Sequence, residues 1–281
     1  MFIYVRITLL AHKFLYTMIN LRTVKPMLTQ ERKKIILENI ENKGSVTVSE
    51  LADQFNMSRM TIRRDLLNLS LSGYVERVHG GAIAVNDGFG SMEQNIIHRI
   101  NHLTPEKRHI ASAAAKLIKP AETIFISAGS TAYWLARNLI HRSELTVIVN
   151  SLIIAKLLAS SEKIEVIVAG GFLRKSELSL VGYPTENYLR DFHVDKVFMG
   201  VNGIDPDVGI TSSNKQELMT DRSILGLSRN IIVIADHTKF GVIASGRVAP
   251  LKVVKTIITS NLVPEQTVSA IRKQGIEVIQ V

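Results

Sequence analysis

From residue 121 onward, short apolar runs alternate with helix-like segments, and this alternation is the strongest constraint on the fold. Seven runs are rich in Ile, Val and Phe: 123–127, 145–149, 164–170, 194–200, 230–236, 253–259 and 276–281. Continuous apolar strands separated by helices are typical of a mostly parallel sheet that helices cover on both faces. The sequence therefore predicts an α/β domain over residues 105–281, with ligands bound at the carboxyl ends of its strands.

Polar and glycine residues follow several of these runs. Ser127, Gly129, Ser130 and Thr131 follow the first run and open a helix, whose N-terminal N–H groups would suit an anion. The other strand ends supply Asn150, Ser151, Gly170, Gly171, Arg174, Gly203 and Lys239. Each loop alone could be an ordinary turn. Together they predict a pocket for a small phosphorylated sugar or polyol, with Arg174 as a fork for phosphate.

Before this region, residues 28–85 predict an α+β winged helix-turn-helix domain. Thr47 and Glu50 have the spacing of a capping box, which starts one helix. Ser58 is a suitable N-cap for the next helix, in which apolar residues recur at helical spacing. Gly80 and Gly81 then supply the turn of a two-stranded wing.

The helix that begins after Ser58 has the composition of a DNA recognition helix. The first turns of such a helix face the base edges in the major groove, and arginine there donates paired hydrogen bonds to guanine or phosphate. The candidate DNA-binding residues are Ser58, Arg59, Met60, Thr61, Arg63 and Arg64, with Arg77 and His79 on the wing. The alternative is a solvated surface on which Arg63 or Arg64 pairs with Asp65 or Glu76.

The net charge of +9 indicates a polyanionic partner. Residues 1–27 contribute +4 of this charge and contain no acid, so the rest of the chain is only mildly basic. Arg6 and the pair His12-Lys13 interrupt the apolar stretches of this segment, and no small-residue cleavage site is evident, so we expect neither a membrane span nor a signal peptide here. We expect residues 1–27 to be an extension outside the fold, with translation starting at Met27. The absence of cysteine excludes disulfides and fits a cytoplasmic protein.

Residues 86–104 join the two domains and predict a linker followed by a solvated helix, before a capped helix that starts at Thr104. His98 and His102 lie four residues apart, which could place two imidazoles on one helical face. No third ligand follows at a matching spacing. We therefore expect neither a metal site nor a cofactor.

Residues 46–82 resemble the winged helix-turn-helix of the DeoR family of bacterial transcriptional regulators, most specifically in TIRRDL (61–66) and HGGA (79–82). The resemblance extends over residues 29–281. It implies operator DNA as partner and a C-terminal sensor of a phosphorylated sugar, similar in fold to ribose-phosphate isomerases and CoA transferases. It also adds Glu217 to the effector site.

The chain departs from the family pattern at four positions. Ser127 stands where the family usually has an acidic residue, and Val149 where a threonine usually precedes Asn-Ser. Asp221 stands where a lysine is common, and Ser260 where an aspartate is frequent. The missing carboxylate at position 127 removes an acceptor for sugar hydroxyls. A different or more anionic ligand would suit such a site.

The leading interpretation is a sequence-specific DNA-binding regulator, which represses a sugar or polyol catabolic operon until a phosphorylated metabolite binds. A palindromic operator requires paired recognition helices, so we expect a homo-oligomer, a dimer or tetramer. The alternative is a sugar-phosphate isomerase-like enzyme, with Asp195, Asp205, Glu217 or Asp236 as base. None of these pairs obviously with a second catalytic group, so we expect no enzyme activity. A third interpretation is an architectural DNA binder without a ligand.

Overall fold

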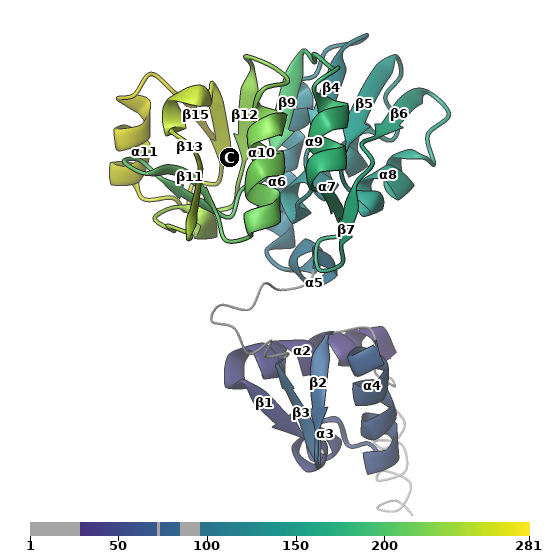
Figure 1. The fold of residues 1–281 in the computed structure, drawn as a ribbon. Helices are drawn as coiled ribbons and strands as arrows, with labels where there is room; N and C mark the ends of the chain where they lie inside the picture. Colours follow the sequence, from purple (N-terminus) through teal and green to yellow (C-terminus); the bar gives the residue numbers. More distant parts are fainter. Residues whose placement is uncertain (1–28, 72–73, 85–95) are drawn as a thin grey trace, which may run out of the picture. The chain divides into compact units, whose positions relative to one another are not determined.

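The computed structural model describes residues 29–71, 74–84 and 96–281. The chain forms two compact units, residues 1–92 and 93–281 (Figure 1). The predicted N-terminal extension and residues 86–95 of the predicted linker lie outside the described residues.

The first unit is a winged helix-turn-helix, as predicted. Its described elements are α2 (Thr29–Lys43), β1 (Ser45–Thr47), α3 (Val48–Phe55), α4 (Arg59–Leu71), β2 (Val75–Val78) and β3 (Gly81–Ala84). The strands form an antiparallel sheet in the order β1-β3-β2, so β1 adds a third strand to the two that the sequence predicted. The tight connection between α3 and α4 positions α4 as the second helix of the motif.

Local side-chain chemistry sets the ends of these helices. The predicted capping box is confirmed: Thr47 Oγ1 accepts from the Glu50 N–H at 3.2 Å, and the Glu50 carboxylate accepts from the Thr47 N–H at 3.0 Å. Asn56 adopts a left-handed conformation (φ 50°), which ends α3 and turns the chain toward α4. Ile36, Leu51 and Ile62 fill the core beneath them.

A buried ion pair joins α2 to α4. Arg32 Nε lies 2.6 Å from Asp65 Oδ2, and each side chain is only about 5% exposed. Asp65 therefore faces the core and pairs with Arg32, whereas the sequence left open a pair with Arg63 or Arg64. The pair fixes the orientation of α4 against α2.

The second unit is built on a parallel sheet of seven strands. The sheet order is β15-β14-β12-β9-β4-β5-β6, and every neighbouring pair is parallel. The strands are β4 (Thr123–Ile126), β5 (Leu145–Val149), β6 (Ile164–Val168), β9 (Lys196–Met199), β12 (Ile231–Ile234), β14 (Thr256–Thr259) and β15 (Glu277–Gln280). Each predicted apolar run supplies one strand, so the predicted α/β fold is confirmed.

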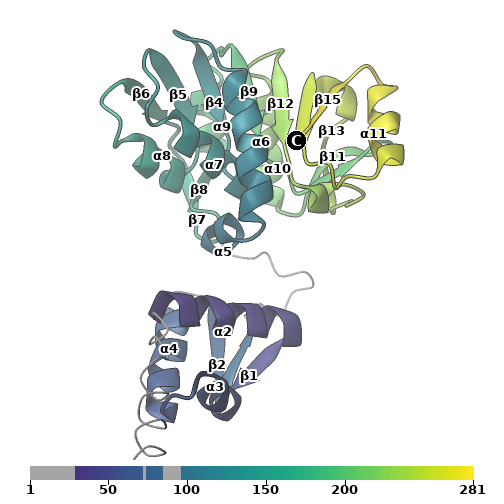
Figure 2. The same ribbon diagram turned by 180° about the vertical axis from the view of Figure 1, so that it is seen from behind.

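Helices cover both faces of this sheet (Figures 1 and 2). One face packs against α6 (Thr104–Lys116), α7 (Ser130–Leu139) and α8 (Leu152–Leu158). The other packs against α9 (Tyr183–Leu189), α10 (Lys215–Leu225) and α11 (Glu265–Arg272). Successive strand residues point into opposite cores, as Phe125 and Ile126 do. No helix in the described ranges is long and apolar enough to cross a membrane.

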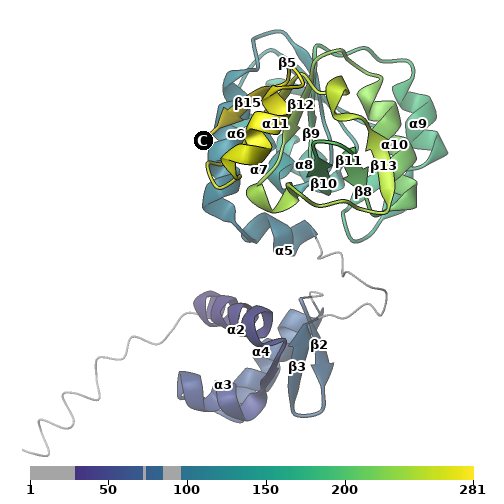
Figure 3. The same ribbon diagram turned by 90° about the vertical axis from the view of Figure 1, so that its left-hand side faces the viewer.

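Short antiparallel strands add to the sheet and were not predicted. β7 (Phe172–Arg174) and β8 (Ser179–Val181) form a hairpin. β10 (Gly203–Asp205), β11 (Gly209–Ser212) and β13 (Gly246–Ala249) form a small separate sheet (Figure 3). The sequence had placed residues 170–174 and 200–205 in loops that close parallel strands, because runs of three residues give little periodic signal.

The helix predicted between the domains is α5 (Ile96–Asn101), and it is an integral part of the second unit. Ile96 and Ile100 are buried, and Trp134 Nε1 donates to the Ile100 carbonyl at 3.0 Å. The prediction of a solvated helix was therefore wrong. The predicted start of the next helix is confirmed, because α6 begins at Thr104; its N-cap is Leu103 in a left-handed conformation, without a side-chain cap.

Candidate effector pocket and DNA-binding face

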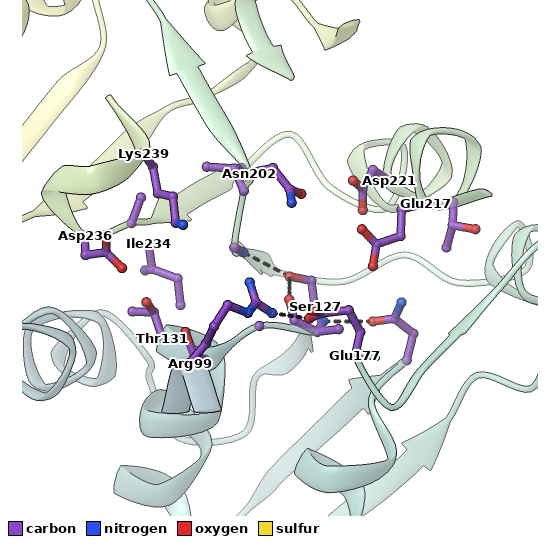
Figure 4. Close-up of a pocket in the computed structure, with 18 residues that line it drawn as sticks. Arg99, Ser127, Thr131, Glu177, Asn202, Glu217, Asp221, Ile234, Asp236 and Lys239 are labelled. Carbon is purple, nitrogen blue, oxygen red and sulfur yellow. Dashed lines mark hydrogen bonds and ion pairs between the residues drawn. The ribbon is translucent and has the colours of Figure 1, made fainter. Parts of the chain in front are cut away.

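A pocket lies where the chain reverses direction across the sheet. The chain leaves β4 toward β5 on one side, whereas β9 pairs with β4 on the other side. This switch point opens a crevice at the carboxyl ends of the strands, and the pocket is lined by residues that follow β4, β5, β9 and β12 (Figure 4).

Seven of the predicted effector residues line this pocket: Ser127, Gly129, Ser130, Thr131, Asn150, Glu217 and Lys239. The lining also contains eleven residues that were not among the predicted site residues: Arg99, Ala128, Glu177, Gly200, Val201, Asn202, Thr220, Asp221, Ile234, Ala235 and Asp236. Asp236 directly follows β12; the sequence named it only as a candidate base for the isomerase alternative, although its place at a strand end also predicts that it lines the pocket. Arg99 and Glu177 come from α5 and the β7–β8 turn, where the ends of the parallel strands give no signal.

Buried polar side chains hold the strand ends of the pocket together. Ser127 Oγ accepts from the Gly200 N–H at 3.0 Å and donates to the Ala128 carbonyl at 3.2 Å. Asn150 Oδ1 accepts from the Ala128 N–H at 3.1 Å, and its Nδ2 donates to the Leu180 carbonyl at 3.2 Å. Ser127 and Asn150 thus fix the loop after β4 in place.

One end of the pocket has the chemistry of an anion site. Gly129 is the N-cap of α7 and has no side chain to cap the helix, so Ser130 and Thr131 present the first backbone N–H groups of that turn. The partial positive charge of a helix N-terminus favours an anion. Lys239, from the short helix η1 (His237–Lys239), adds a full positive charge.

The other end of the pocket is rich in carboxyl groups. Glu177 pairs with Arg99, and Glu217 pairs with Arg174. Burial raises the pKa of Glu177 above its usual value. Burial, with the neighbouring Glu217 adding to it, raises the pKa of Asp221 well above its usual value, while Arg174 acts in the opposite direction.

Lys107 connects α5 to the pocket. Its Nζ donates to the carbonyls of Arg99 at 2.6 Å and His102 at 2.8 Å, and lies 3.8 Å from Asp236 Oδ2. Burial lowers the pKa of Lys107 to about 8, although Asp236 opposes the shift. The buried ammonium therefore ties the C-terminal end of α5 to a lining residue.

Five predicted effector residues do not line the pocket: Ser151, Gly170, Gly171, Arg174 and Gly203. The Arg174 guanidinium, predicted to hold phosphate, instead pairs with Glu217 from a buried position. Ser151 pairs with Ser179 in an isolated β-bridge.

Packing accounts for two of the three glycines. A Cβ on Gly171 would lie 1.9 Å from Thr185 Oγ1, and a Cβ on Gly203 would lie 2.2 Å from the Val242 carbonyl oxygen. Close approach of neighbouring atoms explains these two glycines without a ligand. A Cβ on Gly170 would meet no atom within 4 Å, and the Gly170 carbonyl accepts from Thr185 Oγ1.

Two of the four candidate bases for an isomerase also lie outside the pocket lining. Asp195 accepts from the Thr123 N–H at 2.8 Å, and Asp205 accepts from the Asp207 and Val208 N–H groups. Both carboxylates satisfy backbone donors at turns. Only Glu217 and Asp236 line the pocket.

In the first unit, α4 presents the predicted arginines to solvent. Ser58 Oγ accepts from the Thr61 N–H at 3.2 Å and so caps α4, as predicted. Ile62 and Leu66 are buried beneath the helix. The exposed positions are Arg59, Met60, Arg63 and Arg64 on α4, and Arg77 and His79 on the wing. Met60 is 71% exposed.

Comparison with known proteins decides the family. The DeoR-like helix-turn-helix domain matches residues 32–87, and the DeoR C terminal sensor domain matches residues 103–261. This chain belongs to the DeoR family. The DeoR-family resemblance inferred from TIRRDL and HGGA is thereby confirmed, and the chain is a transcriptional regulator with a DNA-binding and a sensor domain.

Curated DeoR-family relatives match over nearly their whole length. A putative aga operon transcriptional repressor from Escherichia coli O157:H7 is 30% identical over 253 residues, which cover 90% of this chain and 94% of the relative. The glycerol-3-phosphate regulon repressor of Escherichia coli K12 is 31% identical over 229 residues, which cover 82% and 90%. Both are named as regulators.

Among solved structures, ribose 5-phosphate isomerase A from Methanocaldococcus jannaschii is similar at 19% identity with a TM-score of 0.36. The match covers 48% of this chain and 53% of the isomerase. A similarity this low transfers no activity.

Proposed function

We propose that this chain represses a sugar or polyol catabolic operon from the cytoplasm, and that a small phosphorylated metabolite bound in the pocket releases it from DNA. The observation that carries the proposal is the anion end of the pocket. Lys239 and the uncapped N-terminus of α7 meet there at the switch point of the sheet. The name of the glycerol-3-phosphate regulon repressor, a relative of similar length, supports a phosphorylated effector.

On the DNA side, α4 lies in the major groove with Arg59, Met60, Arg63 and Arg64 toward the bases and phosphates. Ser58 caps the first turn of α4 by accepting from the N–H of the half-buried Thr61. Arg77 and His79 on the wing contact the DNA backbone or the minor groove. A homo-oligomer, dimer or tetramer, pairs two such helices on an operator.

Release requires that the effector bind the DNA-free and DNA-bound arrangements with different affinity. Arg99 is suited to report the bound state, because it lines the pocket and belongs to α5, the first described element after the DNA-binding unit. Lys107 Nζ donates a hydrogen bond to the backbone carbonyl of Arg99. A ligand that displaces Arg99 from Glu177 would thus move the element that leads to the DNA-binding unit.

The test is fluorescence anisotropy of the full chain on DNA from upstream of its own gene, with glycerol 3-phosphate, glucose 6-phosphate and related phosphates added in turn. We expect at least one of them to weaken DNA binding, inorganic phosphate at equal concentration to do less, and Lys239→Ala to lose the response while still binding DNA. If no phosphorylated sugar or polyol changes the affinity, the proposed effector class is wrong.

A further inference from the structure

Among the residues that the structure describes, three carboxyl groups and two guanidinium groups meet at one end of the pocket. Glu217 and Asp221 lie one turn apart on α10 and therefore on one face of that helix. Figure 4 shows both beside the pocket, with Glu177 nearby. Glu177, Glu217 and Asp221 form the acidic wall of the pocket and present three carboxyl groups to a bound ligand.

Two of these carboxyl groups have ion-pair partners. Arg99 compensates Glu177, and Arg174 compensates Glu217. Within the described ranges, no lysine or arginine lies within ion-pair distance of Asp221. Burial and the neighbouring Glu217 raise the pKa of Asp221 well above its usual value, and Arg174 acts in the opposite direction.

A second observation points into the same space. Glu177 is 5% exposed and lines the pocket, yet its Oε1 has no hydrogen-bond partner among the residues that the structure describes. A buried acceptor without a donor costs free energy unless a ligand or water supplies the donor. Among the described residues, this side of the pocket thus contains one unsatisfied acceptor, Glu177 Oε1, one unsatisfied donor on its partner, Arg99 Nε, and a carboxyl group, that of Asp221, in no ion pair.

The opposite end of the pocket suits a different charge. Lys239 and Thr131 lie on the side away from Glu217 and Asp221 in Figure 4. Asp236 lies beside Lys239 in Figure 4, and Lys107 Nζ compensates its carboxylate from 3.8 Å. Lys239 and the α7 N-terminus therefore leave this end positive, whereas Glu177, Glu217 and Asp221 lie toward the other end.

We infer that the effector has two charged ends, a phosphate and a primary amine, and that Asp221, Glu217 and Glu177 Oε1 receive the amine. This inference rests on the proposed function and narrows it to phosphorylated amino sugars. An ammonium group donates three hydrogen bonds and supplies a positive charge that a sugar hydroxyl lacks. Its hydrogens reach several acceptors on this side of the pocket, Glu177 Oε1 among them, that a single hydroxyl cannot satisfy together.

The experiment compares ligands that differ only in this group. Isothermal titration of the full chain uses glucosamine 6-phosphate against glucose 6-phosphate, and galactosamine 6-phosphate against galactose 6-phosphate. In at least one pair, the amino form should bind about tenfold more tightly or better, the size expected of a charge-assisted hydrogen bond. Equal or weaker binding of both amino forms, with neutral sugar phosphates still binding, overturns the inference and leaves the proposed function intact.

Variants locate the preference on the wall. Asp221→Asn, which keeps the shape of the side chain, should bind the two members of the preferred pair alike, while Asp191→Asn on an exposed surface keeps the wild-type preference. A preference that survives in Asp221→Asn contradicts the assignment. If no sugar phosphate of either kind binds the wild type, both the inference and the proposed effector class fail. If a variant does not fold, the comparison of amino and neutral sugar phosphates on the wild type still tests the inference.

Discussion

Replacing Asp65 by alanine should unfold the DNA-binding unit while leaving the sensor unit intact. The change removes the carboxylate that lies 2.6 Å from Arg32 Nε and leaves a buried guanidinium with one fewer compensating charge. Breaking such a pair from one side costs about 3–5 kcal/mol. A core of this size rarely supplies more than about 3–5 kcal/mol of stability, so the loss is comparable with the whole stability of the unit.

Hydrogen exchange followed by mass spectrometry reads this effect in the full chain. Peptides from α4 should exchange more than about a hundredfold faster in Asp65→Ala, since about 1.4 kcal/mol corresponds to tenfold. The fluorescence of Trp134, the single tryptophan, reports the second unit and should melt as in the wild type.

Two further variants separate charge from packing. Asp53→Ala removes an exposed acid from α3 and should change stability by less than about 0.5 kcal/mol. Exchanging both partners for apolar residues, as in Arg32→Met with Asp65→Leu, should recover most of the loss, because no buried charge then remains. If α4 exchanges as slowly in Asp65→Ala as in Asp53→Ala, the reasoning about this pair is refuted.

Three further outcomes test other parts of the structure. Thr47→Ala removes the cap that accepts from the Glu50 N–H and should cost about 1 kcal/mol, seen as faster exchange of α3; unchanged exchange would contradict this. Gly203→Ala should lower the melting temperature of the second unit, because its Cβ would lie 2.2 Å from the Val242 carbonyl oxygen; an unshifted melting temperature argues against that contact. Burial lowers the pKa of Lys107 from 10.5 to about 8, so between these values the unfolded chain binds more protons and the contribution of Lys107 to stability rises with pH. Thermal melts across this pH range should show a smaller rise in Lys107→Met, and equal slopes would refute the assignment.

The sequence predicted the main architecture because its signals are local and strong. All seven apolar runs became strands of the parallel sheet, since continuous Ile and Val runs are buried on both faces. The capping box at Thr47 and the cap at Ser58 depend on residues three positions apart, so they too could be read directly.

The pocket was predicted only in part because half of its chemistry comes from contacts distant in sequence. Arg99 and Glu177 are 78 residues apart and meet only because α5 packs on the second unit. Arg174 has the right chemistry for phosphate, but its partner Glu217 holds it behind the lining. Residue type at a strand end shows what a side chain can bind, whereas packing decides which way it faces.

The assignment of α4 as the recognition helix is tested most directly by specific DNA affinity. Anisotropy should compare the wild type, the double variant Arg63→Ala/Arg64→Ala, and the charge-matched control Arg190→Ala/Arg229→Ala on the exposed surface of the second unit, on upstream DNA and on random duplex across a salt series. We expect the wild type and control to prefer upstream DNA and to weaken steeply with salt. The double variant should lose roughly 1–3 kcal/mol for each arginine that reads a base, and with it the preference. A double variant that keeps the wild-type preference and salt dependence would contradict the account.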